Sequence, residues 1–346
     1  MRLEDLDYEL PDELVAQAPA ARRDEARLLV VERASGRLHD QRVTDLPAWL
    51  RAGDVLALNE TRVLPARLEV RRASGGRLEL LFVRPEPAAG AGAWRVLAKP
   101  AKHARPGVVL ETADGTLALE AIGEGEQGER VVRVVRGDLA STLRTQGALP
   151  LPPYIRRAPG AADAERYQTV FARVEGAVAS PTAGLHFTEG LLSRLAVAGV
   201  GQARVVLHVG PGTFRPVTAA DPREHRMDEE WFELSAEAAG TLRAARAAGG
   251  RIVAVGTTSV RALESACDAH GGRLEAASGW TRKFIHEPYR FQAVDALMTN
   301  FHLPRTTLLL LVAAITGPEL LREAYAHAVR ERYRFYSYGD AMLVVE

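Results

Sequence analysis

Residues 251–265, with the sequence RIVAVGTTSVRALES, decide how the second half of this chain folds. A run of four apolar residues leads into Gly256, and Thr257, Thr258 and Ser259 then begin a helical pattern. A short apolar run that passes through a glycine into a helix is typical of a buried strand followed by a crossover helix. We therefore expect an α/β fold in this half of the chain.

The same alternation of strands and helices continues on both sides of this stretch, which implies crossover connections and a mainly parallel sheet. The apolar run at residues 308–315 is too short to span a bilayer, so we expect it to be a buried core element. The pattern predicts helices near residues 189–198, 236–248 and 318–332, and strands near residues 28–31, 203–209, 251–255 and 342–345.

A different pattern interrupts this alternation. Short β-prone runs, such as residues 78–83 and 131–135, are separated by glycine-rich turns, which is typical of a small antiparallel barrel. We therefore predict a three-layer α/β/α sandwich domain, made of residues 1–62 and 150–346, that is interrupted by an antiparallel β-barrel domain, residues 63–149.

Composition limits the class of protein. The chain has 346 residues, 47% hydrophobic and 25% charged, as in an ordinary globular protein. Lys plus Arg equals Asp plus Glu, at 44 each, so no basic excess is available for nonspecific nucleic-acid binding. Cys267 is the single cysteine, no apolar leader precedes Glu4, and residues 225–230, HRMDEE, lack metal-ligand spacing. We expect a cytoplasmic monomer without membrane contact, protein partner or metal.

Three clusters of polar and small residues have both structural and functional interpretations. Residues 176–188, GAVASPTAGLHFT, form either a turn into a helix capped by Thr188 or a loop that approaches a ligand. His208 follows a strand, where ligands of α/β sheets bind, although a lone histidine is more often structural. Thr257, Thr258 and Ser259 either cap their helix or bind an anion at its N-terminus.

Two further clusters lie nearer the C-terminus. Residues 294–311, VDALMTNFHLPRTTLLLL, set polar residues in an apolar segment, so they form either a hydrogen-bonded core network or a pocket wall. Residues 332–342, RYRFYSYGDAM, provide either an aromatic platform for a base or an aromatic anchor packed on the core.

Together these segments resemble the S-adenosylmethionine:tRNA ribosyltransferase-isomerases of queuosine biosynthesis over almost the whole chain. The resemblance includes DYELPDELVAQAP (residues 7–19), GDVLALNETRVLPARL (53–68), LPPYIRR (151–157), RYQTVFA (166–172), GAVASPTAGLHFT, HVGPGTFRPV (208–217), AVGTTSVRALES (254–265), VDALMTNFHLP (294–304) and YRFYSYGDAM (333–342). The chain departs from the family pattern at two places. It has Asp228 where the family has a histidine, and it has Glu287-Pro288-Tyr289 where the family has Pro-Gly-Tyr or Pro-Gly-Phe.

The resemblance implies an enzyme that acts on tRNA carrying 7-aminomethyl-7-deazaguanine at the wobble position. It consumes S-adenosylmethionine, needs no permanently bound cofactor, and gives epoxyqueuosine with release of adenine and methionine. We expect one of His186, His208 or His302 to supply the general base, because imidazole titrates near neutral pH, and Asp340 or Glu230 to protonate or orient adenine.

The remaining site predictions concern binding. We expect the methionine carboxylate to be held by Thr257, Thr258 and Ser259 together with Arg261 or Arg62. The other predicted substrate-binding residues are Asn59, Thr61, Thr182, Gly184, Gly210, Thr213, Asp295, Asn300 and Tyr338. The predicted tRNA contacts are Lys99, Lys102, Arg105, Arg156, Arg157, Arg332 and Arg334.

Two other classes of protein remain open. A noncatalytic RNA-binding protein, built from the barrel and the aromatic segment, would bind RNA with strong salt dependence and without turnover. A nucleotide-dependent transferase that used the turn at Gly256 for phosphate would release phosphate or diphosphate, never adenine.

Overall fold

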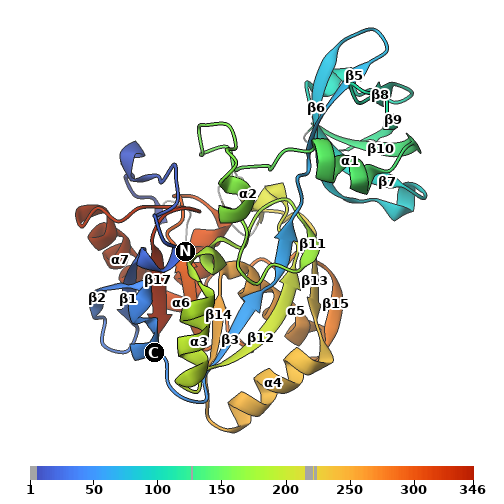
Figure 1. The fold of residues 1–346 in the computed structure, drawn as a ribbon. Helices are drawn as coiled ribbons and strands as arrows, with labels where there is room; N and C mark the ends of the chain where they lie inside the picture. The colour runs from blue at the N-terminus through green and yellow to red at the C-terminus, as the bar shows by residue number, and fades with distance from the viewer. Residues whose placement is uncertain (1–5, 126–127, 215–220, 222–223) are drawn as a thin grey trace.

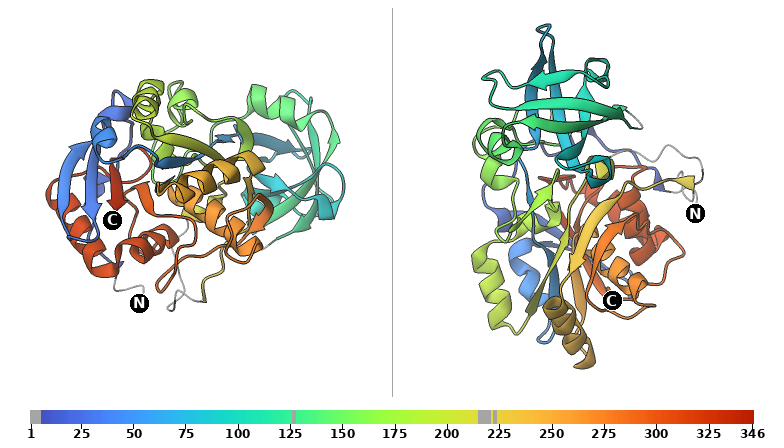
Figure 2. Two further views of the ribbon diagram at one scale, coloured as in Figure 1. Left: turned by 90° about the horizontal axis from the view of Figure 1, so that it is seen from below. Right: turned by 90° about the vertical axis from the view of Figure 1, so that its right-hand side faces the viewer.

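The protein has two parts, an α/β sandwich and a β-barrel that stands at one end of it (Figure 1). The computed structural model describes residues 6–125, 128–214, 221 and 224–346. In both views of Figure 2 the barrel lies beyond the edge of the large sheet and not on either of its faces.

The sandwich is built on a nine-stranded sheet with the order β15-β13-β12-β3-β14-β16-β17-β1-β2. Strands β12, β3, β14 and β16 run parallel in the centre, but β13, β15, β17 and β2 each pair antiparallel with a neighbour. Strands β1 and β17 are again parallel, so the sheet is mixed and the prediction of a mainly parallel sheet is wrong. The strands are β1 (Arg27–Glu32), β2 (Leu38–Arg42), β3 (Val55–Asn59), β12 (Gly201–Leu207), β13 (Glu230–Leu234), β14 (Ile252–Val255), β15 (Ala277–Thr281), β16 (Ala296–Asn300) and β17 (Ala341–Val345).

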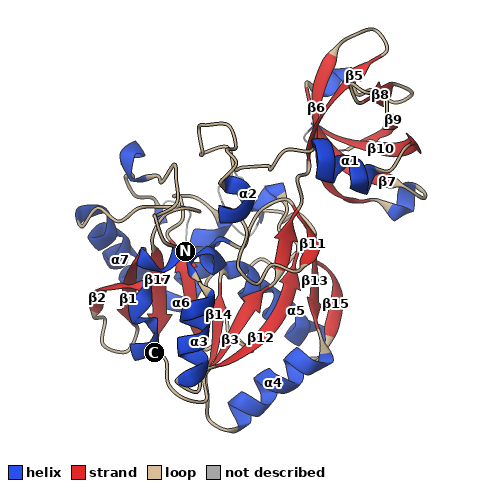
Figure 3. Ribbon diagram, viewed as in Figure 1, coloured by secondary structure: helices blue, strands red, loops and turns tan. Residues whose placement is uncertain are grey.

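Helices cover both faces of this sheet, as Figure 3 shows. Strand β1 illustrates the cause, because Leu29 and Val31 pack into the core on one face while Leu28 and Val30 pack into the core on the other. On the first face lie α4 (Ala236–Ala247), α5 (Thr257–Ala269), α6 (Thr307–Thr316) and α7 (Pro318–Arg330), and on the second lie α3 (Glu189–Val197) and the 3₁₀ helices η4 (Val43–Ala48) and η8 (Thr182–His186).

The barrel is a closed antiparallel sheet with the order β10-β7-β6-β5-β8-β9. Its inward-facing residues, such as Leu80, Phe82 and Val96, form a separate core that helix α1 (Leu139–Gln146) completes with Leu143. The strands are β5 (Arg67–Arg72), β6 (Arg77–Pro85), β7 (Ala93–Lys99), β8 (Val109–Glu111), β9 (Ala118–Glu124) and β10 (Glu129–Arg136). The predicted architecture, a three-layer sandwich interrupted by an antiparallel barrel, is confirmed.

The two connections between barrel and sandwich run side by side. Arg67 and Ala148 exchange backbone hydrogen bonds of 3.1 and 2.7 Å, so the chain leaves and re-enters the sandwich at one place. We propose residues 63 and 149 as the limits of the barrel domain on this basis. Beside this crossing, β4 (Thr61–Val63) pairs in parallel with β11 (Val174–Ala177).

The shorter helices and the apolar segment complete the description. Residues 308–315 lie within α6, whose side chains are almost all buried, so the predicted core element is confirmed. No helix among the described residues is long and apolar enough to cross a membrane. The short helices are η2 (Asp12–Leu14), η3 (Arg23–Glu25), η5 (Pro87–Ala89), η6 (Ala101–His103), α2 (Asp163–Arg166) and η9 (Pro211–Phe214).

Candidate functional site

Most of the predicted site residues meet at one edge of the large sheet. The parallel strands β3, β12, β14 and β16 end there, and the antiparallel strands β13 and β17 begin there. Asn59, His208, Glu230, Asn300 and Asp340 therefore come to the same edge. Asp295 does not, because it precedes β16 and its Oδ2 accepts the backbone N–H of Ile252 (2.8 Å) at the opposite edge.

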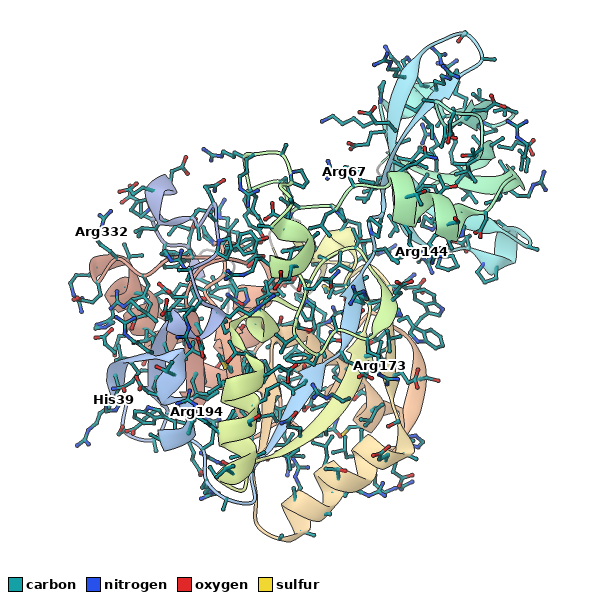
Figure 4. All side chains as sticks on the ribbon, viewed as in Figure 1. His39, Arg67, Arg144, Arg173, Arg194 and Arg332 are labelled. Carbon is teal, nitrogen blue, oxygen red and sulfur yellow. The ribbon has the colours of Figure 1, made fainter. Side chains whose placement is uncertain are left out.

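A cavity of about 550 Å³ lies between this edge and the barrel. Its volume is within the range of small-molecule sites, roughly 300–1,000 Å³. The sandwich lines it with His208, Gly210 and Glu230, and the barrel part lines it with Trp94 and Arg144. Figure 4 shows Arg144 on the barrel side, beside the helix α1 that carries it.

The imidazole of His208 is positioned by two residues. Its Nδ1 lies 2.8 Å from the hydroxyl of Thr61, which is fully buried. A Cβ atom on Gly176, which has φ of +152°, would lie only 2.5 Å from Nε2 of the ring. Burial lowers the pKa of His208 to about 4, so the imidazole is neutral near pH 7.

Asn59 fixes the two strand ends that carry Thr61 and His208. Its Oδ1 accepts the backbone N–H groups of Thr61 and Leu207, both at 3.1 Å, and its Nδ2 donates to the carbonyl oxygen of Leu207 (3.0 Å). The side-chain amide of Asn59 thus makes its hydrogen bonds to the backbone of Thr61 and Leu207. Asn59 holds β3 and β12 in register at the cavity instead of facing it.

The carboxylate of Glu230 forms a second polar group on the same wall. Its Oε1 accepts the backbone N–H of Gly210 (2.7 Å), and its Oε2 accepts a charge-assisted hydrogen bond from Arg261. The guanidinium of Arg261, 3% exposed, also donates from Nε to the carbonyl of Lys283 (2.9 Å). Its Nη2 is buried without a partner among the described residues.

The first turn of α5 lies directly behind this ion pair. Gly256 is the N-cap residue with φ of +90°, and Thr257, Thr258 and Ser259 are buried in the first turn. The Ser259 hydroxyl donates to the carbonyl of Val255 (2.8 Å), whereas Oγ1 of Thr258 has no partner in the described part of the chain. No side chain caps this helix, so the capping interpretation is not supported, and the turn carries a buried hydroxyl without a hydrogen-bond partner in the described part of the chain.

His186 and Asn300 lie elsewhere. Nδ2 of Asn300 donates to Nε2 of His186 (3.1 Å) and to the carbonyl of Tyr336 (3.1 Å). His186 lines a separate cavity of only about 20 Å³ beside Arg334. Burial, followed by the charge of Arg334, lowers the pKa of His186 to about 4.

His302 is enclosed in the core. Its backbone N–H donates to the hydroxyl of Tyr325 (3.0 Å), and Nε2 lies 3.4 Å from the hydroxyl of Thr299. Burial lowers the pKa of His302 to about 3. The residue lines neither of the two cavities that His208 and His186 line.

Asp340 and Tyr338 fasten the C-terminal aromatic segment. The two carboxylate oxygens of Asp340 accept the backbone N–H groups of Arg27 (3.0 Å) and Arg334 (2.8 Å). The hydroxyl of Tyr338 donates to Asp163 (2.7 Å), which also forms two hydrogen bonds with Arg157. In this structure the segment is the packed anchor that was one of its two interpretations.

The other predicted binding residues are dispersed. Arg62 is exposed, with a hydrogen bond of 3.5 Å to the carbonyl of Ala172. Gly184 is packed so closely that a Cβ would lie 2.8 Å from a methyl group of Thr169. Thr182 is half-buried at the start of η8, and the side chain of Thr213 lies outside the described part of the chain.

The predicted RNA-binding cations differ in how they are engaged. Arg156 pairs with Asp12, Arg157 with Asp163, and Arg334 donates to the carbonyl of Ala18. Figure 4 places Arg332 on the side of the sandwich away from the barrel. Lys99, Lys102 and Arg105 instead form one group on the barrel, at the end of β7 and the following 3₁₀ helix.

Sequence reasoning missed the aromatic and charged residues that complete the large cavity. Trp94 comes from the barrel, and Trp231 and Trp280 come from β13 and β15. Arg84 of the barrel pairs with Glu229 of the sandwich (3.2 Å) and stacks over Trp280 (4.7 Å). The position of Trp231, directly after Glu230, was the one local signal that pointed to them.

The fold and the cavity define a class: a two-part α/β protein with a cavity between a sandwich and a barrel. A model of the family described as queuosine biosynthesis protein matches residues 3–344. The chain belongs to this family, and the resemblance seen in its motifs is confirmed.

Individual relatives agree over their full lengths. A protein of Symbiobacterium thermophilum named S-adenosylmethionine:tRNA ribosyltransferase-isomerase is 50% identical, with 100% of both chains covered. A protein of the same name from Anaeromyxobacter sp. (strain K) is 51% identical over 100% of this chain and 99% of its own. The solved structure of S-adenosylmethionine tRNA ribosyltransferase from Thermotoga maritima is 36% identical, covers 99% of this chain and 100% of that one, and has a TM-score of 0.56.

Proposed function

We propose that this chain catalyses the reaction for which its relatives are named, the transfer and isomerisation of the ribosyl group of S-adenosylmethionine onto tRNA. The observation that carries the proposal is the cavity between sandwich and barrel, where His208 and Glu230 face three tryptophans. The acceptor is 7-aminomethyl-7-deazaguanine at the wobble position, and the product is epoxyqueuosine with adenine and methionine released. S-adenosylmethionine is consumed, and no permanently bound cofactor is required.

The reaction needs proton transfers in a site that excludes water. The sulfonium acidifies the adjacent 5′-carbon, so a base removes a proton there, and adenine leaves as it takes up a proton. The primary amine of the acceptor base then adds to the sugar, and a ring rearrangement closes the epoxide as methionine departs. Of the predicted catalytic residues, His208 and Glu230 line the large cavity, and we assign the proton transfers to this pair.

The methionine carboxylate is placed at the first turn of α5. The helix N-terminus favours an anion, and the unpartnered Thr258 Oγ1 and Arg261 Nη2 are buried donors at this turn. Arg261 touches Glu230, which lines the cavity, so the turn lies directly behind the cavity wall. Arg62, which is exposed on β4, is the weaker of the two predicted arginine partners.

We place the planar rings of the two substrates against the tryptophans of the cavity. Trp231 and Trp280 meet edge to face with ring centroids 5.7 Å apart, and Trp94 faces the same cavity from the barrel. Aromatic side chains stack well on purine-like rings. Adenine and the acceptor base both have a purine-like ring that can stack on these side chains.

For tRNA, we place the phosphate contacts on the barrel group of Lys99, Lys102 and Arg105. These side chains form no ion pair within the described part of the chain, whereas Arg157 pairs with Asp163. The Lys99→Ala, Lys102→Ala double variant is expected to lower the slope of log affinity against log salt by about 1–2. Arg157→Ala is the comparison variant, and an unchanged slope in the double variant would contradict this footprint.

The proposed function is tested by incubating the protein with S-adenosylmethionine and precursor tRNA. The expected products are adenine, methionine and a tRNA base whose mass has increased by the transferred ribosyl-derived group. Release of phosphate or diphosphate from a nucleotide would instead support the nucleotide-dependent transferase. Salt-dependent RNA binding without any adenine release would support a noncatalytic RNA-binding protein.

A further inference from the structure

The contacts of His208 determine which of its two ring nitrogens is free to act on a ligand. Nδ1 faces the hydroxyl of Thr61 at 2.8 Å, whereas Nε2 forms no hydrogen bond with the described residues, and the side chain lines the cavity. A neutral imidazole carries one proton, which is on Nδ1 or on Nε2. The hydrogen bond with Thr61 therefore decides whether Nε2 accepts or donates.

The buried hydroxyl of Thr61 has one hydrogen-bond partner among the described residues, Nδ1 of His208. If Nδ1–H donated to the hydroxyl oxygen, the hydroxyl hydrogen would have no acceptor among the described residues. A buried donor without an acceptor is unfavourable. If the hydroxyl donates to Nδ1, both groups are satisfied, and the imidazole proton lies on Nε2.

Asn59 and Gly176 hold this arrangement in place. The side chain of Asn59 binds the backbone N–H groups of Thr61 and Leu207, which fixes the hydroxyl opposite the imidazole. Gly176 packs closely against the ring, since a Cβ there would lie 2.5 Å from Nε2 and 2.6 Å from Cε1. Both His208 and Gly176 line the cavity, so the imidazole is held at the wall of a space that a ligand can occupy.

We propose that Thr61 is a positioning residue that holds neutral His208 as its Nε2–H tautomer, so that His208 presents a hydrogen-bond donor to the cavity. Its target is an acceptor atom that gains negative charge during ribosyl transfer, such as a ring nitrogen of adenine or a sugar oxygen. Within the proposed pair, Glu230 is then the proton acceptor. This inference rests on the proposed function, because the donor matters catalytically only if the cavity is the active site.

The tautomer is measured without reference to activity. Long-range ¹H–¹⁵N NMR spectra of histidine-labelled full-length protein identify the protonated nitrogen, and the His208→Gln variant assigns the signal. The wild type is expected to show Nε2–H, Thr61→Ser is expected to keep it, and Thr61→Val is expected to lose the preference. A predominantly Nδ1–H imidazole in the wild type would overturn the inference, whatever the activity.

Kinetics distinguish a donor from a base. The amide of glutamine can place an N–H near the position of Nε2, so His208→Gln is expected to retain kcat within about tenfold, while His208→Ala loses about 100-fold. Thr61→Val is expected to lower kcat at least about tenfold at unchanged KM, and Thr61→Ser to restore it. Equal losses in His208→Gln and His208→Ala, or a fully active Thr61→Val, would refute the donor role.

Failure of the proposed function has a different result. A wild-type protein that releases no adenine from S-adenosylmethionine and precursor tRNA would contradict the proposed reaction, while the NMR measurement would still decide the tautomer. A wild type that releases adenine, with an Nδ1–H imidazole, would leave the reaction in place and overturn the role of Thr61.

Discussion

At the scale of single residues, the position of the His208 ring depends on Gly176. Its φ of +152° and the 2.5 Å from an added Cβ to Nε2 leave no room for a side chain. Because the nearest atoms belong to the imidazole and not to backbone, the ring has to move if a methyl group is added. This glycine thus has a spatial function that its place in a small-residue segment did not reveal.

We predict that Gly176→Ala lowers kcat for adenine release by at least about tenfold, because a displaced imidazole no longer meets its ligand. The matched control is Gly190→Ala on the exposed first turn of α3, where the nearest atom to an added Cβ is 3.9 Å away. The control is expected to keep full activity. Both variants are compared by steady-state assay and by circular dichroism, and a fully active Gly176→Ala would contradict the steric argument.

Acid sensitivity is also predicted by the buried His186 and His302 and by the half-buried His208. Burial lowers the pKa to about 4 for His186 and His208 and to about 3 for His302, against about 6.5 in an unfolded chain. Between these values the unfolded state binds protons that the folded state does not, so the free energy of unfolding falls as pH decreases through this window.

Urea denaturation at about pH 7.5 and about pH 5 measures this effect. The loss of free energy of unfolding between the two pH values is expected to be smaller in His302→Gln than in the wild type, because one of the three groups no longer titrates. The comparison uses the difference within each protein, so a general destabilisation by the substitution cancels. An identical pH-dependent loss in both proteins would contradict a role for His302.

The residue-scale predictions succeeded where a motif lies at a strand end. His208 and Glu230 were named from the sequence and line the large cavity, because chain order alone places such residues at the edge of a sheet. His186 could not be separated from them, since its partner Asn300 is 114 positions away in the chain. Trp280 was missed for the same reason, because only the pairing of β15 with β13 brings it to the cavity.

At the scale of secondary-structure elements, Glu264 links α5 to the segment before β16. This carboxylate is fully buried and accepts the backbone N–H groups of Gln292, Ala293 and Val294 as well as the hydroxyl of Tyr289. Glu264 forms no ion pair with any side chain that the structure describes, so these hydrogen-bond donors stabilise its carboxylate. The glutamate therefore fixes a loop that has no regular structure of its own.

We predict that Glu264→Gln lowers the free energy of unfolding by about 3 kcal/mol, because an amide N–H₂ replaces one acceptor oxygen and faces backbone donors. The control is Glu323→Gln on the exposed side of α7, which is expected to change stability by less than about 0.5 kcal/mol. Chemical denaturation of the two variants checks this difference. Equal effects would show that the buried hydrogen bonds contribute little.

Element types were predictable from the sequence, but strand direction was not. The predicted helix at residues 236–248 is α4 (Ala236–Ala247), and the predicted strand at residues 251–255 is β14, because apolar periodicity and a Ser235 cap act locally. The direction of β13 and β17 depends on which neighbour each strand meets, and the sequence carries no local signal for that. The expected parallel pairing is therefore found in the centre of the sheet and between β1 and β17, whereas the other pairs are antiparallel.

At the scale of the whole molecule, Arg84 connects the barrel to the sandwich across the cavity. It pairs with Glu229 and lies over Trp280, and Glu229 also pairs with Arg282 (3.1 Å). The side chains of Arg84 and Glu229 are only 20% and 31% exposed, so the contact is partly protected from solvent. It therefore restrains the barrel where the cavity meets the surface.

We predict that Arg84→Ala broadens the distribution of distances between barrel and sandwich. Spin labels on Ser74→Cys in the barrel and Ser193→Cys on α3 report this distance, and the native Cys267 is buried. Arg133→Ala, which breaks a pair with Glu120 inside the barrel, is the control and is expected to leave the distribution unchanged. A distribution as narrow as that of the wild type would show that Arg84 does not restrain the barrel.

The pairing of β1 with β17 has a consequence for biosynthesis. Residues 27–32 emerge from the ribosome long before their parallel neighbour, residues 341–345, is translated. The barrel, whose buried core residues lie within residues 66–143, is able to fold while β1 still lacks this partner. The nascent sandwich therefore presents an open strand edge to other chains until residues 341–345 have been translated, which makes this interval the one in which chaperone protection matters most.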